Sequence, residues 1–125
     1  MNSTIKILIV HGDLVLARFI HRGLREEGYG VDLADGAEEG LPKGMFGSYD
    51  LIVLGSGLRQ RVEILQTLRS WGTPARIAVV SIDNSRKAKK QMLDAGADDY
   101  IVPRFGWDGF MSRVRTLLSS RTPRG

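Results

Sequence analysis

Residues that could take part in chemistry directly follow short apolar runs of this sequence. In chain order they are His11, Gly12 and Asp13 after residues 5–10, Gly55 after 51–54, Ser81 after 77–80, and Pro103 with Arg104 after 100–102. An imidazole, a carboxylate, a hydroxyl and a guanidinium, together with glycine amides, can bind metal ions, phosphates or carboxylates. The first question is which of these chemistries the sequence allows.

These residues do not make a complete set of metal ligands or of groups for covalent catalysis. Asp13 alone is an inadequate ligand set for Mg²⁺ and is better explained as the cap of a following helix. His11 and Asp13 lack a third ligand for a transition metal. Ser81 with His11 could suggest a hydrolase, but a G-x-S-x-G pattern, a Walker A sequence and G-x-G-x-x-G are all absent. We therefore expect no enzyme activity, no catalytic residue, no metal and no cofactor.

The apolar runs alternate with helical patterns. Strands are predicted at residues 5–10, 31–34, 51–54, 77–80 and 100–102. The helical patterns are a stripe of Leu16, Ile20 and Leu24, a weak pattern over 37–45, residues 64–68 closing near Trp71, a segment from Asn84 or Ser85 to Ala95, and residues 110–118. This order predicts an α/β fold with a parallel sheet covered on both faces. Ligand chemistry then belongs at the carboxyl ends of the strands, where the residues above lie.

Composition limits the classes of protein. The chain has 125 residues, enough for one domain, with 42% hydrophobic and 26% charged residues and no cysteine. No apolar run approaches the roughly 20 residues of a membrane span, and the N-terminus does not resemble a secretory signal. We expect a cytoplasmic protein without a membrane partner. The net charge of +4 permits an acidic partner but is weak evidence for nucleic-acid binding.

Several phrases of the sequence resemble the receiver domain of bacterial two-component response regulators. They are IKILIV at 5–10, GYGVDLADGAEEGL at 28–41, YDLIVL at 49–54, LDAGADDYI at 93–101 and FMSRVRTLLSSR at 110–121. The last two are most like the OmpR/PhoB branch, whose members carry a DNA-binding domain after the receiver. The resemblance implies a flavodoxin-like, doubly wound (βα)5 fold with strand order 2-1-3-4-5. It also implies a receiver-like domain over residues 1–120, with 121–125 as a tail or the start of a linker.

The family's phosphorylation site is the part that the sequence departs from. In the family, an acidic pair after strand 1 and an aspartate after strand 3 hold Mg²⁺, and that aspartate accepts the phosphoryl group. A hydroxyl after strand 4 and a lysine after strand 5 bind the phosphoryl oxygens, and an aromatic residue on strand 5 reports the state. The resemblance aligns the acidic pair with His11 and Gly12, the acceptor with Gly55, the lysine with Pro103, the following proline with Arg104, the hydroxyl with Ser81 and the aromatic residue with Tyr100. We therefore expect neither aspartyl phosphorylation nor tight Mg²⁺ binding here.

Two kinds of function remain open. The first is a phosphorylation-independent signalling module that contacts a protein partner or a second copy through the face made by helix 4, strand 5 and helix 5. The matching charged residues are Arg86, Lys87, Lys89, Lys90, Asp98, Asp99, Arg113 and Arg115, which could equally be ordinary solvated charges. DNA would be contacted only through a C-terminal domain beyond residue 125. The second is a sensor of a small anion or metabolite that uses the emptied pocket of Gly12, Gly55, Ser81 and Arg104.

Overall fold

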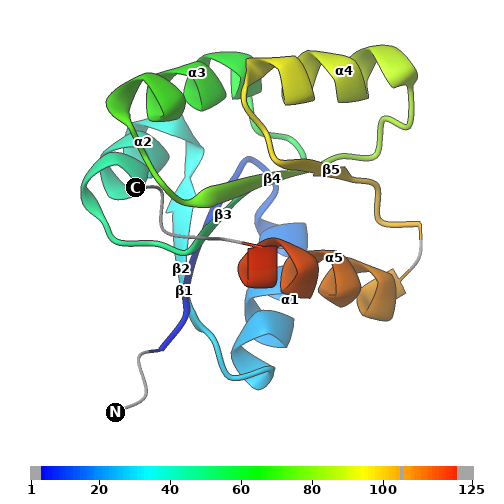
Figure 1. Cartoon of the computed structure of the whole chain (residues 1–125). Helices are drawn as coiled ribbons and strands as arrows, with labels where there is room; N and C mark the ends of the chain where they lie inside the picture. Colours follow the sequence, from blue (N-terminus) through cyan, green and yellow to red (C-terminus); the bar gives the residue numbers. More distant parts are fainter. Residues whose placement is uncertain (1–3, 105, 121–125) are drawn as a thin grey trace.

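Five parallel strands alternate with five helices in a computed structural model that describes residues 4–104 and 106–120 (Figure 1). The strands are β1 Lys6–His11, β2 Gly30–Asp35, β3 Leu51–Leu54, β4 Arg76–Val80 and β5 Asp99–Ile101. The helices are α1 Leu14–Glu26, α2 Gly36–Phe46, α3 Arg61–Trp71, α4 Arg86–Ala95 and α5 Gly106–Ser120. The sheet order β2-β1-β3-β4-β5 confirms the predicted flavodoxin-like, doubly wound topology.

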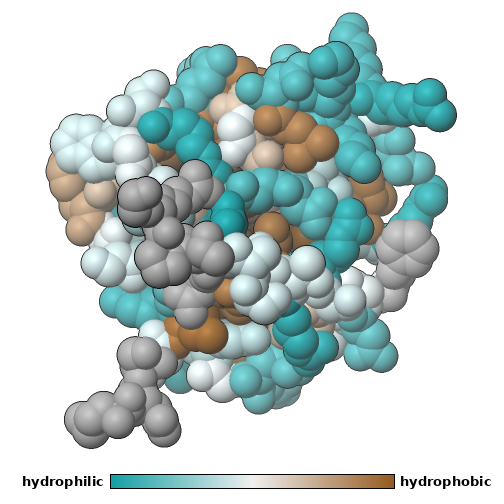
Figure 2. Space-filling model, in the orientation of Figure 1, coloured by the Kyte–Doolittle hydropathy of each residue, from teal (hydrophilic) through white to brown (hydrophobic). Residues whose placement is uncertain are grey.

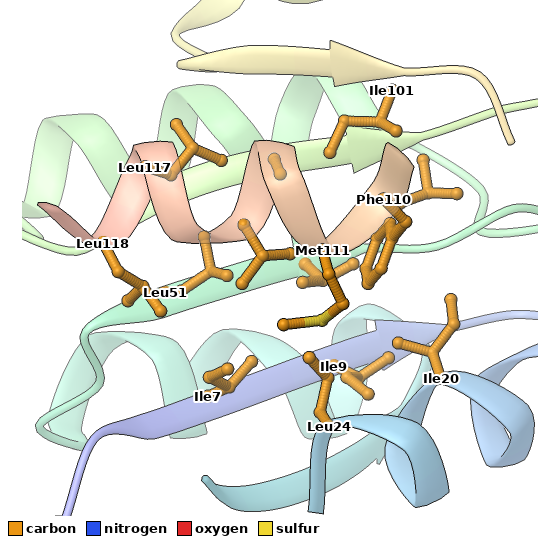
Figure 3. Packing of buried hydrophobic residues seen from close by; sticks show 14 of the residues in the cluster. Ile7, Ile9, Ile20, Leu24, Leu51, Ile101, Phe110, Met111, Leu117 and Leu118 are labelled. Atoms are coloured by element: carbon orange, nitrogen blue, oxygen red, sulfur yellow. The ribbon is translucent and has the colours of Figure 1, made fainter. Parts of the chain in front are cut away.

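Helices cover both faces of the sheet, and this explains the unbroken apolar runs. Ile7 and Ile9 of β1 pack with α1 and α5, whereas Leu8 and Val10 pack with α2, α3 and α4. Figure 3 shows Met111 of α5 pointing toward β1 on the first of these faces. Since successive side chains of a strand point to opposite faces, every position of a central strand must be apolar.

The second helix is more regular than its sequence indicates. Residues 36–46 form one continuous helix despite Gly40, Pro42 and Gly44. A Cβ atom at Gly40 would lie 2.5 Å from Val10 Cγ1, and one at Gly44 would lie 2.9 Å from Leu68 Cδ2. The two glycines therefore allow the helix to pack close to the sheet and to α3. This tertiary contact outweighs their low helix propensity.

Several element boundaries differ from the predicted ones by one residue. His11 is the last residue of β1 rather than the first residue of a loop. Strand β5 ends at Ile101, so Val102 lies outside it, and the Arg104 amide donates to the Val102 carbonyl at 2.8 Å as the chain turns. The predicted tail at 121–125 lies outside the described residues. Within the described ranges, no helix is both long and apolar enough to cross a membrane.

Candidate functional site

The sheet register brings the ends of three strands together. The Gly55 amide donates to the Val10 carbonyl at 2.8 Å, and the Ser81 amide donates to the Ile101 carbonyl at 3.0 Å. His11 and Ser81 are buried, with 5% and 4% of their surfaces exposed. Three of the residues singled out in the sequence therefore lie at one edge of the sheet, where a doubly wound fold places its ligand site.

The two glycines of this edge have different surroundings. A Cβ atom at Gly12 would lie 2.1 Å from the Gly57 carbonyl oxygen, so the loops after β1 and β3 are in direct backbone contact. A Cβ atom at Gly55 would lie 3.4 Å from the Val10 oxygen and 3.7 Å from His11 Cβ, which are ordinary contact distances. The fold thus excludes a side chain at residue 12 but leaves room for a small one at residue 55.

His11 occupies the edge without a hydrogen bond at one of its nitrogens. Its Nδ1 atom is buried and has no partner among the described residues. The side chain borders a cavity of about 270 Å³ together with Gly12, Leu14, Leu33, Asp35 and Glu39. Among the residues that the structure describes, no three of the His, Cys, Asp and Glu side chains are placed to hold a metal ion.

Asp13 is a helix cap, as its position in the sequence predicts. Its Oδ1 atom accepts hydrogen bonds from the amides of Val15 at 3.1 Å and Leu16 at 3.3 Å. These two amides begin α1 and have no partner within the helix. The one carboxylate that directly follows β1 is therefore used in folding.

The loop between β4 and α4 is held by Ser81, Asp83 and Tyr100. Ser81 Oγ accepts from the Asp83 amide at 3.1 Å, and the Tyr100 hydroxyl donates to the Asp83 carbonyl at 2.6 Å. Asp83 Oδ1 accepts from the Ser85 amide at 2.9 Å. The Ser85 backbone and side-chain hydrogen bonds, with the Arg61 charge nearby, hold the pKa of Asp83 below its usual 3.8. Ser81 and Tyr100 therefore both hold the β4–α4 loop in place.

Arg61 reaches the same edge, although it was not among the predicted site residues. Its Nη1 atom lies 3.5 Å from the Val80 carbonyl oxygen at the end of β4. A signal for it exists in the sequence, because a cation at the first position of a helix opposes the helix dipole and needs another reason to be there. Arg61 places a positive charge beside the β4–α4 loop.

Pro103 and Arg104 do not border the cavity that His11 and Gly12 border. They border a separate cavity of about 330 Å³, with residues of α4, β5 and α5. Gly12 borders the cavity of His11 and contacts Gly57 instead. Gly12 and Arg104 thus border different cavities, and the single pocket of Gly12, Gly55, Ser81 and Arg104 stays a prediction.

Most charges expected on the face of helix 4, strand 5 and helix 5 are paired within the chain. Asp98 accepts from Arg69 Nη2 at 2.7 Å and from the Ile77 amide at 2.8 Å, and its other oxygen lies 3.5 Å from Arg76 Nη1. The remaining ion pairs are Arg113 with Asp99, Lys90 with Asp94, and Arg115 with Glu27. Hydrophilic side chains project from the α4 region in Figure 2. The side chains of Arg86, Lys87 and Lys89 make no hydrogen bond or ion pair with the described residues.

These contacts define what the edge can do chemically. The described ends of β1 and β3 offer a buried imidazole and two glycines. Asp13, which follows β1, caps a helix, and the carboxylates of Asp35 and Glu39 border the His11 cavity. Phosphoryl transfer to a side chain needs a nucleophile and charged groups that hold the transferred oxygens. The hydrogen bonds and backbone contacts at this edge position the loops after β1, β3 and β4.

Comparisons with known proteins agree on one family. Residues 7–115 match the model of the response regulator receiver domain. The chain is 35% identical over 115 residues to the transcriptional regulatory protein PcoR of Escherichia coli, and 36% identical to CusR of the same species, covering 90% of this chain and 51% of each relative. It therefore spans about half the length of these curated relatives.

Solved structures show the same fold. A response regulator receiver domain protein from Methanospirillum hungatei superposes with a TM-score of 0.87 at 26% identity, covering 98% of this chain and 100% of that one. A two-component response regulator from Clostridium difficile superposes with a TM-score of 0.85 at 27% identity, covering 94% of this chain and 98% of that one.

Proposed function

The chain belongs to the response regulator receiver domain family of two-component signalling, and we propose that it signals without accepting a phosphoryl group. A receiver domain is a signalling module rather than a classic enzyme. The observation that carries the proposal is the pair of contacts at residues 12 and 55. The resemblance aligns Gly55 with the family's acceptor and aligns the acidic pair with His11 and Gly12, and Gly12 packs against Gly57.

The losses at this edge are physically consistent with one another. Clustered carboxylates repel unless a cation is bound, and a partly buried lysine without its anion loses hydration without compensation. Replacing only one of these charged residues would leave the other charges without their partners, whereas replacing all of them removes both the repulsion and the desolvation cost. The chain has His11, Gly12, Gly55 and Pro103 at the corresponding positions.

The position of Tyr100 supports a signalling state that does not need phosphorylation. The side chain is only 4% exposed, and its hydroxyl is bonded to the Asp83 carbonyl. In the family the aromatic residue of strand 5 reports the state of the site. Here it is held by the backbone of the β4–α4 loop, so we propose that the loop and the adjoining face have one preferred conformation.

We further propose that α4, β5 and α5 form the face that contacts a protein partner or a second copy of the chain. Its paired charges fix its shape, and the unpaired cations of α4 favour an acidic surface. Because the chain spans about half of its transcriptional relatives, we propose that it regulates transcription through a DNA-binding domain of the OmpR/PhoB type.

Light scattering over a concentration series tests this face. Self-association should be unchanged by an acyl phosphate with Mg²⁺, because the proposed contact does not depend on phosphorylation. Lys87→Glu should weaken it about tenfold by reversing a charge on α4, whereas Arg25→Glu on α1 should leave it unchanged. If the chain stayed monomeric at concentrations of about hundreds of micromolar, its dissociation constant for self-association would be weaker than that of most specific complexes. This result would exclude a second copy as the partner and leave a different protein.

A further inference from the structure

We propose that the cavity between the first turns of α4 and α5, with β5 between them, binds a small organic anion that carries phosphate or carboxylate groups. Its volume of about 330 Å³ lies within the range of small-molecule sites. The cavity is separate from the one that His11 and Gly12 border. It shares Arg86, Lys89 and Arg113 with the proposed contact face, but anion binding does not require a protein partner.

The lining of this cavity carries one sign of charge. Arg86, Lys89, Arg104 and Arg113 border it, and no carboxylate is among its described lining residues. Concave, partly apolar surfaces of one charge concentrate ions of the opposite charge, because low-dielectric walls focus the field. The cavity therefore favours a ligand with more than one negative charge.

Two of the cations are available to a ligand. Arg86 and Lys89 are exposed, and their side chains make no hydrogen bond or ion pair with the described residues. Their spacing of three places them on the same side of α4. Two cations in the first turn of a helix oppose its dipole, and a bound anion would offset that cost.

A third cation is held in a fixed orientation. Arg113 Nε donates to Asp99 Oδ2 at 2.9 Å, and Nη2 donates to Asp99 Oδ1 at 3.1 Å. This two-bond pair fixes the plane of the guanidinium at the cavity wall without using Nη1. A fixed guanidinium loses less side-chain entropy when it binds a planar carboxylate or a phosphate.

The backbone contributes to the same site. Both α4 and α5 begin at the cavity, and Figure 1 shows them on opposite sides of β5. The partial positive charge at the start of each helix adds to the field of the side chains. Tyr100, Ile101 and Phe110 form an apolar part of the lining, which suits the carbon skeleton of an organic anion rather than a bare inorganic ion.

Titration calorimetry at low salt tests the site with two probes, inorganic pyrophosphate and citrate. We expect saturable binding of at least one probe with a dissociation constant below about 1 mM. The probe that binds more tightly distinguishes phosphate from carboxylate chemistry. Amide NMR signals of Gly106 and Gly109 should shift with the same dissociation constant, because both glycines border the cavity.

Two double variants distinguish specific binding in the cavity from non-specific attraction of an anion to a positively charged protein. Arg86→Gln with Lys89→Gln should weaken binding at least about tenfold, whereas Arg18→Gln with Arg25→Gln on α1 removes the same charge and should change it less than about threefold. Equal effects of the two pairs, or no saturable binding of either probe at about 10 mM, would overturn the proposal. Failure of the protein contacts in light scattering would leave these results unaffected.

Discussion

Two regions of this receiver differ in their charged side chains. One is the strand-end edge, with His11, Gly12, Gly55 and Ser81, and the other is the face formed by α4, β5 and α5. At the edge, the backbones of Gly12 and Gly57 are in contact, and the His11 side chain is buried with no hydrogen-bond partner for Nδ1 among the described residues. At the face, Asp98 and Asp99 are held by arginines, and a cavity lined by cations remains open. Charged side chains are thus retained and ordered at the face, whereas the described ends of β1 and β3 carry glycines and one buried imidazole.

The link between the two regions is the β4–α4 loop. Ser81 contacts it from the edge, and Tyr100 contacts it from the face. The same loop begins α4, because Ser85 Oγ accepts from the Ala88 amide at 3.1 Å. Changes at the edge can therefore reach the face through a few hydrogen bonds.

Removing the arginine that holds the start of β5 should have the largest effect. Arg69 bonds Asp98 and also the carbonyls of Gly96 at 2.9 Å and Ala75 at 3.0 Å. Arg69→Ala leaves these acceptors and a partly buried carboxylate without their donor. We expect a loss of about 2–4 kcal/mol in the free energy of unfolding, measured by urea denaturation.

The matched control for this variant is Arg22→Ala. Arg22 pairs with Glu26 at 3.7 Å, with both side chains largely exposed. An exposed pair of this kind contributes less than about 1 kcal/mol. If the two variants were equally stable, the contacts of Arg69 would not be what holds the α4–β5 connection.

Adding one methyl group at each glycine of the edge should sharpen the comparison. Gly12→Ala should cost about 2–3 kcal/mol, because its Cβ would meet the Gly57 carbonyl. Gly55→Ala should change stability by less than about 1 kcal/mol, because its Cβ meets only ordinary contacts. Thermal and urea unfolding of both variants measure the difference, and a reversed order would contradict the backbone contact between the loops.

Tyr100→Phe should remove the hydrogen bond that connects β5 to the β4–α4 loop. This variant removes the hydroxyl that donates to the Asp83 carbonyl at 2.6 Å and keeps the ring that packs in the core. We expect a loss of about 1 kcal/mol and shifted NMR signals for residues 82–86. Unchanged signals for this loop would show that the hydroxyl does not hold it.

The smallest expected effect is a dependence of stability on acid. The pKa of Asp83 is lowered in the folded chain, so its contribution is fully present above the unfolded value of about 3.8 and is lost as pH falls through the folded pKa. Asp83→Asn keeps an oxygen for the Ser85 amide but removes the charge. Urea denaturation between about pH 3 and 6 should show a shallower acid loss for the variant. An identical pH profile would contradict the role of the charge.

The sequence predicts the order of elements well, because each element has a local signal. Buried strands appear as apolar runs, and Asp13 and Ser85 precede their helices as caps. The helix predicted over 37–45 is confirmed, and its sequence pattern is weak because Gly40 and Gly44 serve packing against distant residues. Local propensity cannot report such contacts.

The geometry of the candidate site was harder to predict for the same reason. The contact of Gly12 with Gly57 and the partners of Asp98 join residues far apart in the chain. The resemblance to the family located the edge by residue, but it did not show that Gly12 packs against Gly57 or that Arg104 borders another cavity. Arg61 was not predicted because the apolar pattern marks this helix only from residue 64, whereas the helix begins at Arg61 itself.

We propose above all that this edge does not accept a phosphoryl group. Incubation with an acyl phosphate and Mg²⁺, followed by intact-mass measurement, tests it directly, with a receiver that has the strand-3 aspartate as the positive control. We predict no added mass for this chain and none for Gly55→Asp, because Gly12 cannot carry a Mg²⁺ ligand while the loop of Gly57 lies against it. A stoichiometric gain of one phosphoryl group by the unmodified chain would contradict the account.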